Sequence, residues 1–226
     1  MAEDIAKEIQ QMLGEAWKFF CDYYDKKVPE YPKSWGLDEK GAKKAHWICW
    51  NEYDLMFHIG RFFHDILTKG EEKKYSNIEI HFEKNVNITN FKGYRFDGRL
   101  DELKNKLEMK NGPKVDMIIA YEDKDEPFLL CAEVKCFHGP SERYGKKPIE
   151  KIREDIKKLK AIRDCEIAKR VVFILFDDYY WNTKKETTNE IKHELERIEK
   201  DEGIKVLFHS SEAKLEKYKQ PMRVQT

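Results

Sequence analysis

The 226-residue sequence lacks the features by which several classes of protein are recognised. No apolar run approaches the roughly 18 residues that a membrane-spanning helix needs, so we expect no membrane partner. The first residues, MAEDIAKEIQQ, do not form the positive-then-apolar pattern of a signal peptide, which makes a cytoplasmic protein our expectation. There are no internal repeats and no low-complexity tracts, and this length favours a single domain.

Cysteine chemistry and two common hydrolase motifs are also missing. The five cysteines are scattered without a Cys-x-x-Cys pair, so we expect reduced thiols rather than a zinc site or a disulfide framework. No serine lies in a Gly-x-Ser-x-Gly elbow, and there is no glycine-rich phosphate-binding loop. The serine-hydrolase and P-loop hypotheses therefore have no support in the sequence.

The chain also has no net charge, because 43 Lys and Arg balance 43 Asp and Glu. A protein that binds a polyanion is expected to present a positive surface, so the distribution of the charges matters more than their sum. Residues 143–170 hold 11 Lys and Arg against 5 Asp and Glu, a net charge of +6. Residues 186–202 hold 7 acids against 3 bases, a net charge of −4. The sequence therefore predicts a basic segment and an acidic one.

The most informative part of the sequence predicts a β-hairpin. Residues 115–121 (VDMIIAY) and 128–135 (FLLCAEVK) are rich in apolar and β-branched residues, as strands are. The charged stretch between them ends in Pro127 and predicts a turn. Antiparallel pairing about this turn places Tyr121 opposite Phe128, and that pair fixes the register of all the others.

Three charged residues lie inside these apolar strands. In the predicted register Asp116 faces Glu133, with Cβ atoms about 4.5–5.5 Å apart. Lys135 shares a face with Glu133 because the two are two residues apart on one strand. Burying a charge is costly unless it is paired or bound to a metal. The three residues are therefore expected to form a cluster in which chemistry takes place.

Two carboxylates this close repel each other, which raises the pKa of one of them unless a cation intervenes. Mg²⁺ prefers such oxygen ligands, with water and substrate phosphate in its other positions. Lys135 is then able to orient or deprotonate a water molecule, or to stabilise charge that develops on a phosphate. The cluster therefore predicts a Mg²⁺ site, with Mn²⁺ as an alternative metal.

Pro113-x-x-Asp116, the hydrophobic hairpin and Glu133-x-Lys135 together resemble the signature of the PD-(D/E)XK nuclease superfamily, which has the restriction-endonuclease-like fold. The resemblance implies that Asp116 and Glu133 bind Mg²⁺ and that the backbone carbonyl of Val134 is a further ligand. It also implies that Lys135 assists the attack of water on a phosphodiester. Pro113 stands three residues before Asp116 rather than beside it, which is a common departure in this superfamily.

Many members of the superfamily carry a catalytic glutamate on a helix before the sheet. Residues 51–67 predict an amphipathic helix, and Asn51 is suited to be its N-cap. The apolar stripe of this helix extends backwards to Glu52, which is therefore expected to point inward. Glu52 is our candidate for the helical glutamate; the alternative is that it only complements the helix dipole.

The whole pattern predicts an α/β fold, with a central mixed β-sheet flanked by helices and a restriction-endonuclease-like core. We expect one nuclease-like domain made of an N-terminal helical extension (1–45), the α/β core (46–210) and a C-terminal tail (211–226). Besides the hairpin, strands are expected at 78–88, 171–176 and 204–209, and helices at 2–27, 99–110, 149–163 and 186–202.

A basic surface is expected beside the predicted site, because the loop after Lys135 leads into the basic helix 149–163. The candidate contacts to nucleic-acid phosphates are Lys146, Lys147, Lys151 and Arg153, although each also fits a solvated helix face. His138 is a candidate proton donor or else a loop histidine without a catalytic role. Trp47 and Trp50 fit either stacking on bases or contacts in a core or dimer.

By resemblance, the expected protein is a Mg²⁺-dependent nuclease, most simply an endonuclease, that hydrolyses DNA in restriction, repair or recombination. The first alternative is a catalytically inactive nucleic-acid-binding or assembly module on the same fold. The second is another α/β enzyme in which the motif is accidental. RNA stays open as the substrate, and a homodimer stays open because dimers are common in this fold.

Overall fold

The computed structural model describes residues 2–27, 51–69, 74–87, 89–91, 96, 98–122, 127–137, 145–178 and 188–210. The predictions for Cys49, His138, the two tryptophans and the C-terminal tail lie outside these residues. The elements are, in chain order, α1 (Ala2–Lys27), α4 (Glu52–Lys69), β1 (Ile78–Asn85), α5 (Arg99–Leu107), β2 (Lys114–Tyr121), β3 (Phe128–Phe137), α7 (Lys146–Asp164), β4 (Ala168–Asp177), α8 (Asn189–Asp201) and β5 (Lys205–Ser210).

The five strands form one mixed sheet in the order β1-β2-β3-β4-β5. Strands β1, β2 and β3 pair antiparallel, whereas β3, β4 and β5 pair parallel. Strand β3 is therefore the boundary between the antiparallel and the parallel half. In the hairpin Met117 lies opposite Ala132 and Ile119 opposite Leu130. This is the register predicted from the sequence, so that prediction is confirmed.

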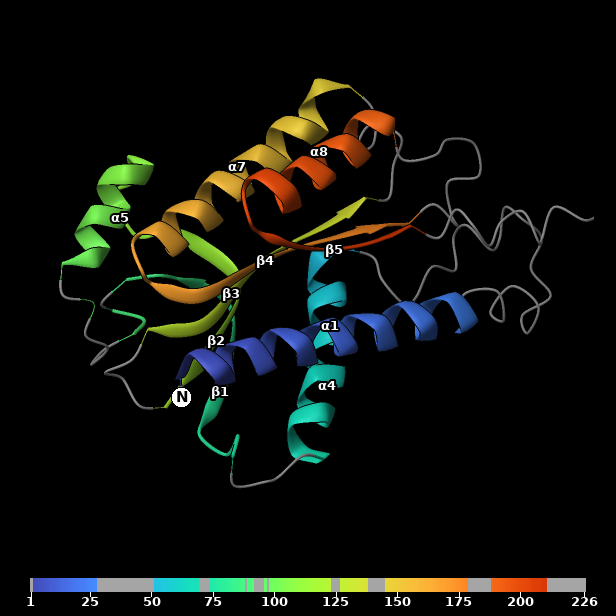
Figure 1. Ribbon diagram of the computed structural model, residues 1–226, viewed down its shortest axis with the longest axis horizontal. Coiled ribbons are helices and arrows are strands. Elements are labelled where there is room, and N and C mark those ends of the chain that lie inside the picture. Colours follow the sequence, from blue (N-terminus) through green and yellow to red (C-terminus); the bar gives the residue numbers. More distant parts are fainter. Residues whose placement is uncertain are drawn as a thin grey trace, which may run out of the picture.

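Helices cover both faces of the sheet, as Figure 1 shows: α1 and α4 on one face, and α5, α7 and α8 on the other. The expected α/β class, a mixed sheet flanked by helices, is confirmed. Successive side chains of a strand point to opposite faces, so each central strand contributes to two cores. Met117 packs in the cluster with α1 and α4, and Ile118 packs in the cluster with α7.

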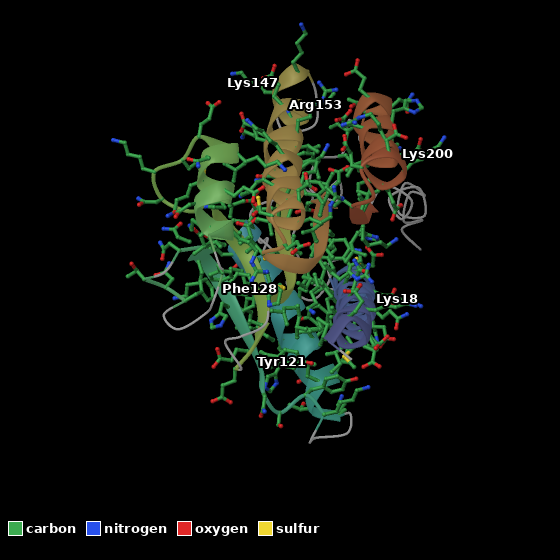
Figure 2. All side chains as sticks on the ribbon, turned by 60° about the vertical axis from the view of Figure 1, so that its left-hand side comes forward. Lys18, Tyr121, Phe128, Lys147, Arg153 and Lys200 are labelled. Atoms are coloured by element: carbon green, nitrogen blue, oxygen red, sulfur yellow. The ribbon has the colours of Figure 1, made fainter. Side chains whose placement is uncertain are left out.

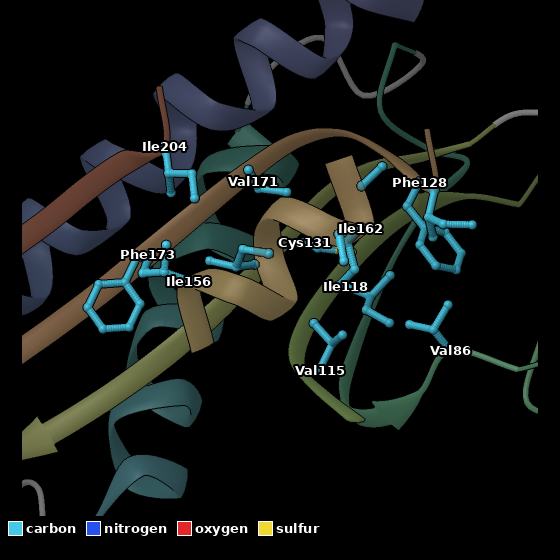
Figure 3. Packing of buried hydrophobic residues seen from close by; sticks show 14 of the residues in the cluster. Val86, Val115, Ile118, Phe128, Cys131, Ile156, Ile162, Val171, Phe173 and Ile204 are labelled. Atoms are coloured by element: carbon cyan, nitrogen blue, oxygen red, sulfur yellow. The ribbon is translucent and has the colours of Figure 1, made fainter. Parts of the chain in front are cut away.

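The core under α7 joins apolar side chains of the sheet with apolar stripes of α7, α5 and α8. Ile118, Cys131 and Phe173 of the sheet meet Ile156 and Ile162 of α7 in one buried cluster (Figure 3). Burying each large side chain contributes about 1.5–3 kcal/mol relative to exposure. The apolar stripe of α7, with its three- and four-residue spacing, therefore determines which face of this helix packs against the sheet.

The first helix is part of this architecture and not an addition to it. Ile9, Leu13 and Phe20 of α1 are fully buried in the cluster that also holds Phe63 of α4. Their spacing gives one apolar stripe that covers the sheet. The predicted helix over 2–27 is therefore present, but it forms a layer of the core and not an extension.

Helix α7 and strand β4 each start three residues before the predicted residues 149 and 171, whereas two other elements end three residues earlier than predicted. Strand β1 ends at Asn85 and not at residue 88, because the backbone turns there and Asn87 caps the turn by accepting a hydrogen bond from the Asn90 amide at 2.8 Å. Helix α5 ends at Leu107 and not at residue 110, because Glu108 adopts a left-handed conformation with φ 55°. The predicted start at residue 186 lies outside the described residues, and α8 is described from Asn189.

The entry into β2 depends on a close backbone approach. A Cβ atom on Gly112 would lie 1.6 Å from the carbonyl oxygen of Val86, so only glycine fits there. The Val86 amide donates to the carbonyl of Pro113 at 2.9 Å, which extends the pairing of β1 with β2. These contacts set the position of β2 three residues before Asp116.

Among the described helices, none combines the length and apolar character that a bilayer crossing requires. The four described cysteines are buried; they are Cys21, Cys131, Cys136 and Cys165.

Candidate active site

The candidate site lies at the end of the hairpin where the backbone pairing of β2 with β3 stops and a side chain of β2 contacts the backbone of β3. The Cα pairs of the hairpin run up to Met117 and Ala132, and beyond them the Asp116 Oδ2 accepts a hydrogen bond from the Val134 amide at 2.7 Å. The N–H and C=O of one strand residue point toward the same neighbouring strand. The carbonyl of Val134 is therefore expected on the β2 side of β3 as well, and its role as a metal ligand stays a prediction.

Glu133 is the most buried charged side chain of the site, with 1% of its surface exposed. One carboxylate oxygen, Oε2, accepts a hydrogen bond from Lys158 at 2.5 Å, and the other, Oε1, has no hydrogen-bond partner among the described residues. Burial raises the pKa of Glu133 well above its usual value; Asp116 raises it further, and Lys158 lowers it in part. The charged form of Glu133 is therefore costly unless a further cation is present.

Lys135 lies among carboxylates. Its Nζ is 3.1 Å from Asp155 Oδ2 and 3.4 Å from Glu52 Oε1. Burial tends to lower the pKa of Lys135, but the nearby carboxylates outweigh burial and raise that pKa above its ordinary value. Lys135 is therefore an ammonium group in this arrangement, suited to orient a substrate or to stabilise negative charge rather than to deprotonate water.

Glu52 reaches the site from the opposite helical layer. Asn51 caps α4, because its Oδ1 accepts hydrogen bonds from the amides of Tyr53 and Asp54 at 2.8 and 3.1 Å, as predicted. This cap fixes the helix start, so that the first helical side chain meets Lys135. Burial raises the pKa of Glu52, and the charge of Lys135 opposes this shift. The structure thus brings Glu52 to the other predicted residues.

Two further residues of the site, Asp155 and Lys158, were not predicted from the sequence. Asp155 and Lys158 of α7 contact Lys135 and Glu133, and their charged groups lie 3.7 Å apart. A signal was available: these residues continue one helical face from Lys151 at four- and three-residue spacing. Polar residues beside an apolar stripe also fit a solvated face, so only the docking of α7 on the sheet distinguishes the two interpretations.

The predicted basic residues separate into two groups. Lys147 and Lys151 line a cleft of about 630 Å³ together with Glu52, Lys135 and Asp155. Lys146 is exposed and starts the same helix.

Arg153 does not face this cleft. Its guanidinium donates two hydrogen bonds to the carboxylate of Glu194 on α8, at 2.9 and 3.1 Å. Figure 2 shows Lys147 and Arg153 toward the same end of α7, with Arg153 on the side of α8. The prediction that Arg153 belongs to the basic surface beside the site is therefore not matched by its position.

The charges of the site do not balance. Four carboxylates, from Glu52, Asp116, Glu133 and Asp155, surround the ammonium groups of Lys135 and Lys158. With every group ionised, the formal charge of this set is −2, the charge that one divalent cation offsets.

The donor atoms suit Mg²⁺, although they do not form a complete cage. Among the described residues, no group of three or more His, Cys, Asp and Glu side chains is arranged to hold a metal ion. Mg²⁺ is often held by only one or two carboxylates, with water and substrate phosphate completing its shell. Asp116, the unpaired oxygen of Glu133 and the carbonyl of Val134 fit that kind of open site.

No family model matches the chain, and neither a curated protein nor a solved structure matches it. The resemblance to the PD-(D/E)XK superfamily therefore depends on the motif residues of the sequence alone.

Proposed function

We propose that this protein is a metal-dependent nuclease that hydrolyses phosphodiester bonds of DNA, in restriction, repair or recombination, and that it is related to the PD-(D/E)XK superfamily. The single observation that supports this most is the convergence of Asp116, Glu133 and Lys135 on one end of the hairpin, beside an open cleft. A buried carboxylate oxygen without a hydrogen-bond partner on Glu133 adds to this support.

In this proposal Asp116, Glu133 and the carbonyl of Val134 hold Mg²⁺ or Mn²⁺. When bound there, the cation would supply positive charge that polarises the phosphodiester and makes water a stronger nucleophile. Lys135, kept as an ammonium by Asp155 and Glu52, orients the scissile phosphate and stabilises the negative charge that develops on its oxygens.

The surroundings of the site favour a polyanionic substrate. Lys147 and Lys151 line the cleft, and both belong to the segment with a net charge of +6. Contacts of lysine to phosphate supply affinity that does not depend on sequence. A DNA backbone lying in the cleft would therefore contact these two lysines together with Lys135.

One observation favours a second candidate, an inactive nucleic-acid-binding or assembly module on the same fold. Lys158 contacts Glu133, and Lys135 contacts Asp155 and Glu52, so much of the negative charge is compensated without a metal. Such a module would bind nucleic acid in EDTA as well as in Mg²⁺.

The proposal is tested by measuring cleavage of labelled DNA in Mg²⁺ for wild type, Asp116→Asn and Glu133→Gln. Each substitution removes a ligand charge, and we expect a rate loss of at least about a hundredfold, as for other groups that stabilise a transition state. Asp101→Asn is the matched control, because Asp101 is an exposed aspartate of α5 with 79% of its side-chain surface accessible. Cleavage at the wild-type rate by folded Asp116→Asn or Glu133→Gln would contradict the site.

A further inference from the structure

Lys158 is the most unusual side chain of the site, because it is a cation held against a proposed metal ligand. Its Nζ donates to Glu133 Oε2 at 2.5 Å and to the carbonyl of Lys114 at 2.9 Å, and it lies 3.7 Å from Asp155 Oδ1. Only 19% of its side-chain surface is exposed. One ammonium thus connects α7, the start of β2 and the centre of β3.

The two oxygens of Glu133 are consequently in different surroundings. Oε2 is taken by Lys158, and Oε1 is buried without a hydrogen-bond partner among the described residues. Buried polar atoms in native proteins nearly always have a partner, so this oxygen, which no described protein group occupies, is available to a cation or another ligand. Because Lys158 is fixed by three contacts, it dictates which oxygen of Glu133 is left for that ligand.

We propose that Lys158 is a built-in counter-ion that occupies one oxygen of Glu133 and limits the site to a single divalent cation. This inference rests on the proposed nuclease function and adds the number of metal ions and the residue that sets it. Lys158 acts through Glu133 and is therefore a positioning residue.

The counter-ion role predicts opposite effects on metal binding and on cleavage. Removing the charge of Lys158 changes the formal charge of the site from −2 to −3 and frees Glu133 Oε2, so divalent cations should bind more tightly. Cleavage should become slower, because Glu133 loses the contact that orients it, and small displacements of reacting groups are costly. If Lys158 had a purely structural role, its replacement would instead lower both the affinity for divalent cations and the rate of cleavage.

The experiment is a calorimetric titration of Mn²⁺ into the full chain, for wild type and Lys158→Met, with cleavage measured on the same samples. We expect one Mn²⁺ per wild-type chain. For Lys158→Met we expect affinity at least about tenfold higher, because a like charge a few ångström away in a partly buried site is removed. Lys158→Arg keeps the charge and should retain one Mn²⁺ per chain.

Two controls keep the test decisive. Lys157→Met removes an exposed lysine from the neighbouring position of α7 and should leave Mn²⁺ binding unchanged. If Lys158→Met does not fold, as judged by its melting curve, Asp155→Asn replaces it. That variant changes the formal charge from −2 to −1, so its Mn²⁺ affinity should fall, and an unchanged or higher affinity would overturn the inference.

The outcomes separate this inference from the function on which it rests. One Mn²⁺ per wild-type chain, together with equal or weaker binding by folded Lys158→Met, overturns the counter-ion role and leaves the nuclease proposal standing. Two Mn²⁺ per wild-type chain overturn the single-cation limit alone. No Mn²⁺ binding by wild type and by Lys158→Met overturns both proposals.

Discussion

At the scale of single residues, Glu133 is where the requirements of folding and of chemistry conflict. Its neighbours along β3, Ala132 and Val134, are fully buried, and it is buried with them. A hydrophobic residue of similar size would suit this environment better, because a buried ion pair rarely stabilises as much as good apolar packing. The energetic cost of Glu133 is consistent with selection for chemistry rather than for stability.

This conflict predicts how stability depends on pH when EDTA removes divalent metals. The pKa of Glu133 is raised in the folded state above its ordinary value of 4.5, so its contribution to stability is present below the unfolded pKa. That contribution is lost as pH rises through the raised folded pKa. The glutamine of Glu133→Gln cannot ionise. The melting temperature of this variant, relative to that of wild type, should therefore increase as pH rises from about 4 to about 8.

Thermal melts across this pH range measure the effect. Glu102→Gln, at an exposed position of α5, is the matched control. If the melting temperature of Glu133→Gln relative to wild type stays constant or falls with rising pH, ionisation of Glu133 does not destabilise the fold.

At the scale of elements, helix α7 connects two charged networks through its different faces. One face brings Asp155 and Lys158 to the site, while Arg153 reaches Glu194 on α8. Arg197 also donates to Glu194 at 2.9 Å. The hydrogen bonds from these two arginines lower the pKa of Glu194 to about 2. The second network holds α8 against α7, and its contacts among the described residues include none of the proposed metal ligands.

Glu194→Gln should therefore destabilise the fold without affecting metal binding. A 6% exposed carboxylate that accepts from two arginines is replaced by a neutral amide, which should cost about 1–3 kcal/mol in the free energy of unfolding. Because the pKa of Glu194 is lowered, this stabilisation is present above the unfolded pKa and is lost as pH falls toward about 2. Chemical denaturation at neutral and acidic pH, combined with Mn²⁺ titration, measures both effects.

A loss of Mn²⁺ affinity in folded Glu194→Gln would contradict the separation of the two networks. Unchanged stability at neutral pH would show that the arginine pair is only a surface contact.

The elements that the sequence predicts well are those with strong local patterns. The hairpin register follows from the turn before Phe128 and from the rule that a slip of one residue would turn Asp116 to the other face of the sheet. The cap of α4 follows from the chemistry of Asn51. Lys158 and the true partner of Arg153 do not follow, because both depend on how α7 docks against the sheet and beside α8. Helical periodicity fixes the faces of α7 but does not say which neighbour each face meets.

At the scale of the whole molecule, the candidate site lies at the boundary between the two halves of the sheet. Strand β3 pairs antiparallel with β2 and parallel with β4, so the start of β2 and the carboxyl end of β3 lie at the same end of the sheet. Crevices beside the carboxyl ends of strands are common ligand sites in open α/β sheets. Helix α4 closes this end from one face and α7 from the other (Figure 1).

The zero net charge is compatible with a nucleic-acid substrate because the charges are separated in space. Lys147 and Lys151 line the cleft. In the acidic helix α8, Glu194 accepts hydrogen bonds from Arg153 of α7 and from Arg197 of α8 itself. Long-range attraction of DNA by the whole molecule is therefore expected to be weak, and the local lysines supply most of the phosphate contacts. Affinity should accordingly fall with rising salt in proportion to the few phosphates contacted.

The central claim is tested most directly by cleavage of a panel of labelled nucleic acids in Mg²⁺, Mn²⁺ and EDTA, with wild type and Lys135→Ala side by side. The panel holds single-stranded, duplex, flapped and four-way DNA together with RNA. We predict that wild type cuts at least one of the DNA substrates in Mg²⁺ and in Mn²⁺, and that it cuts none of them in EDTA. Folded Lys135→Ala should lose the metal-dependent cleavage. Cleavage that survives in EDTA or in Lys135→Ala, or binding without any cleavage by wild type, would contradict the assignment of this site as a metal-dependent nuclease.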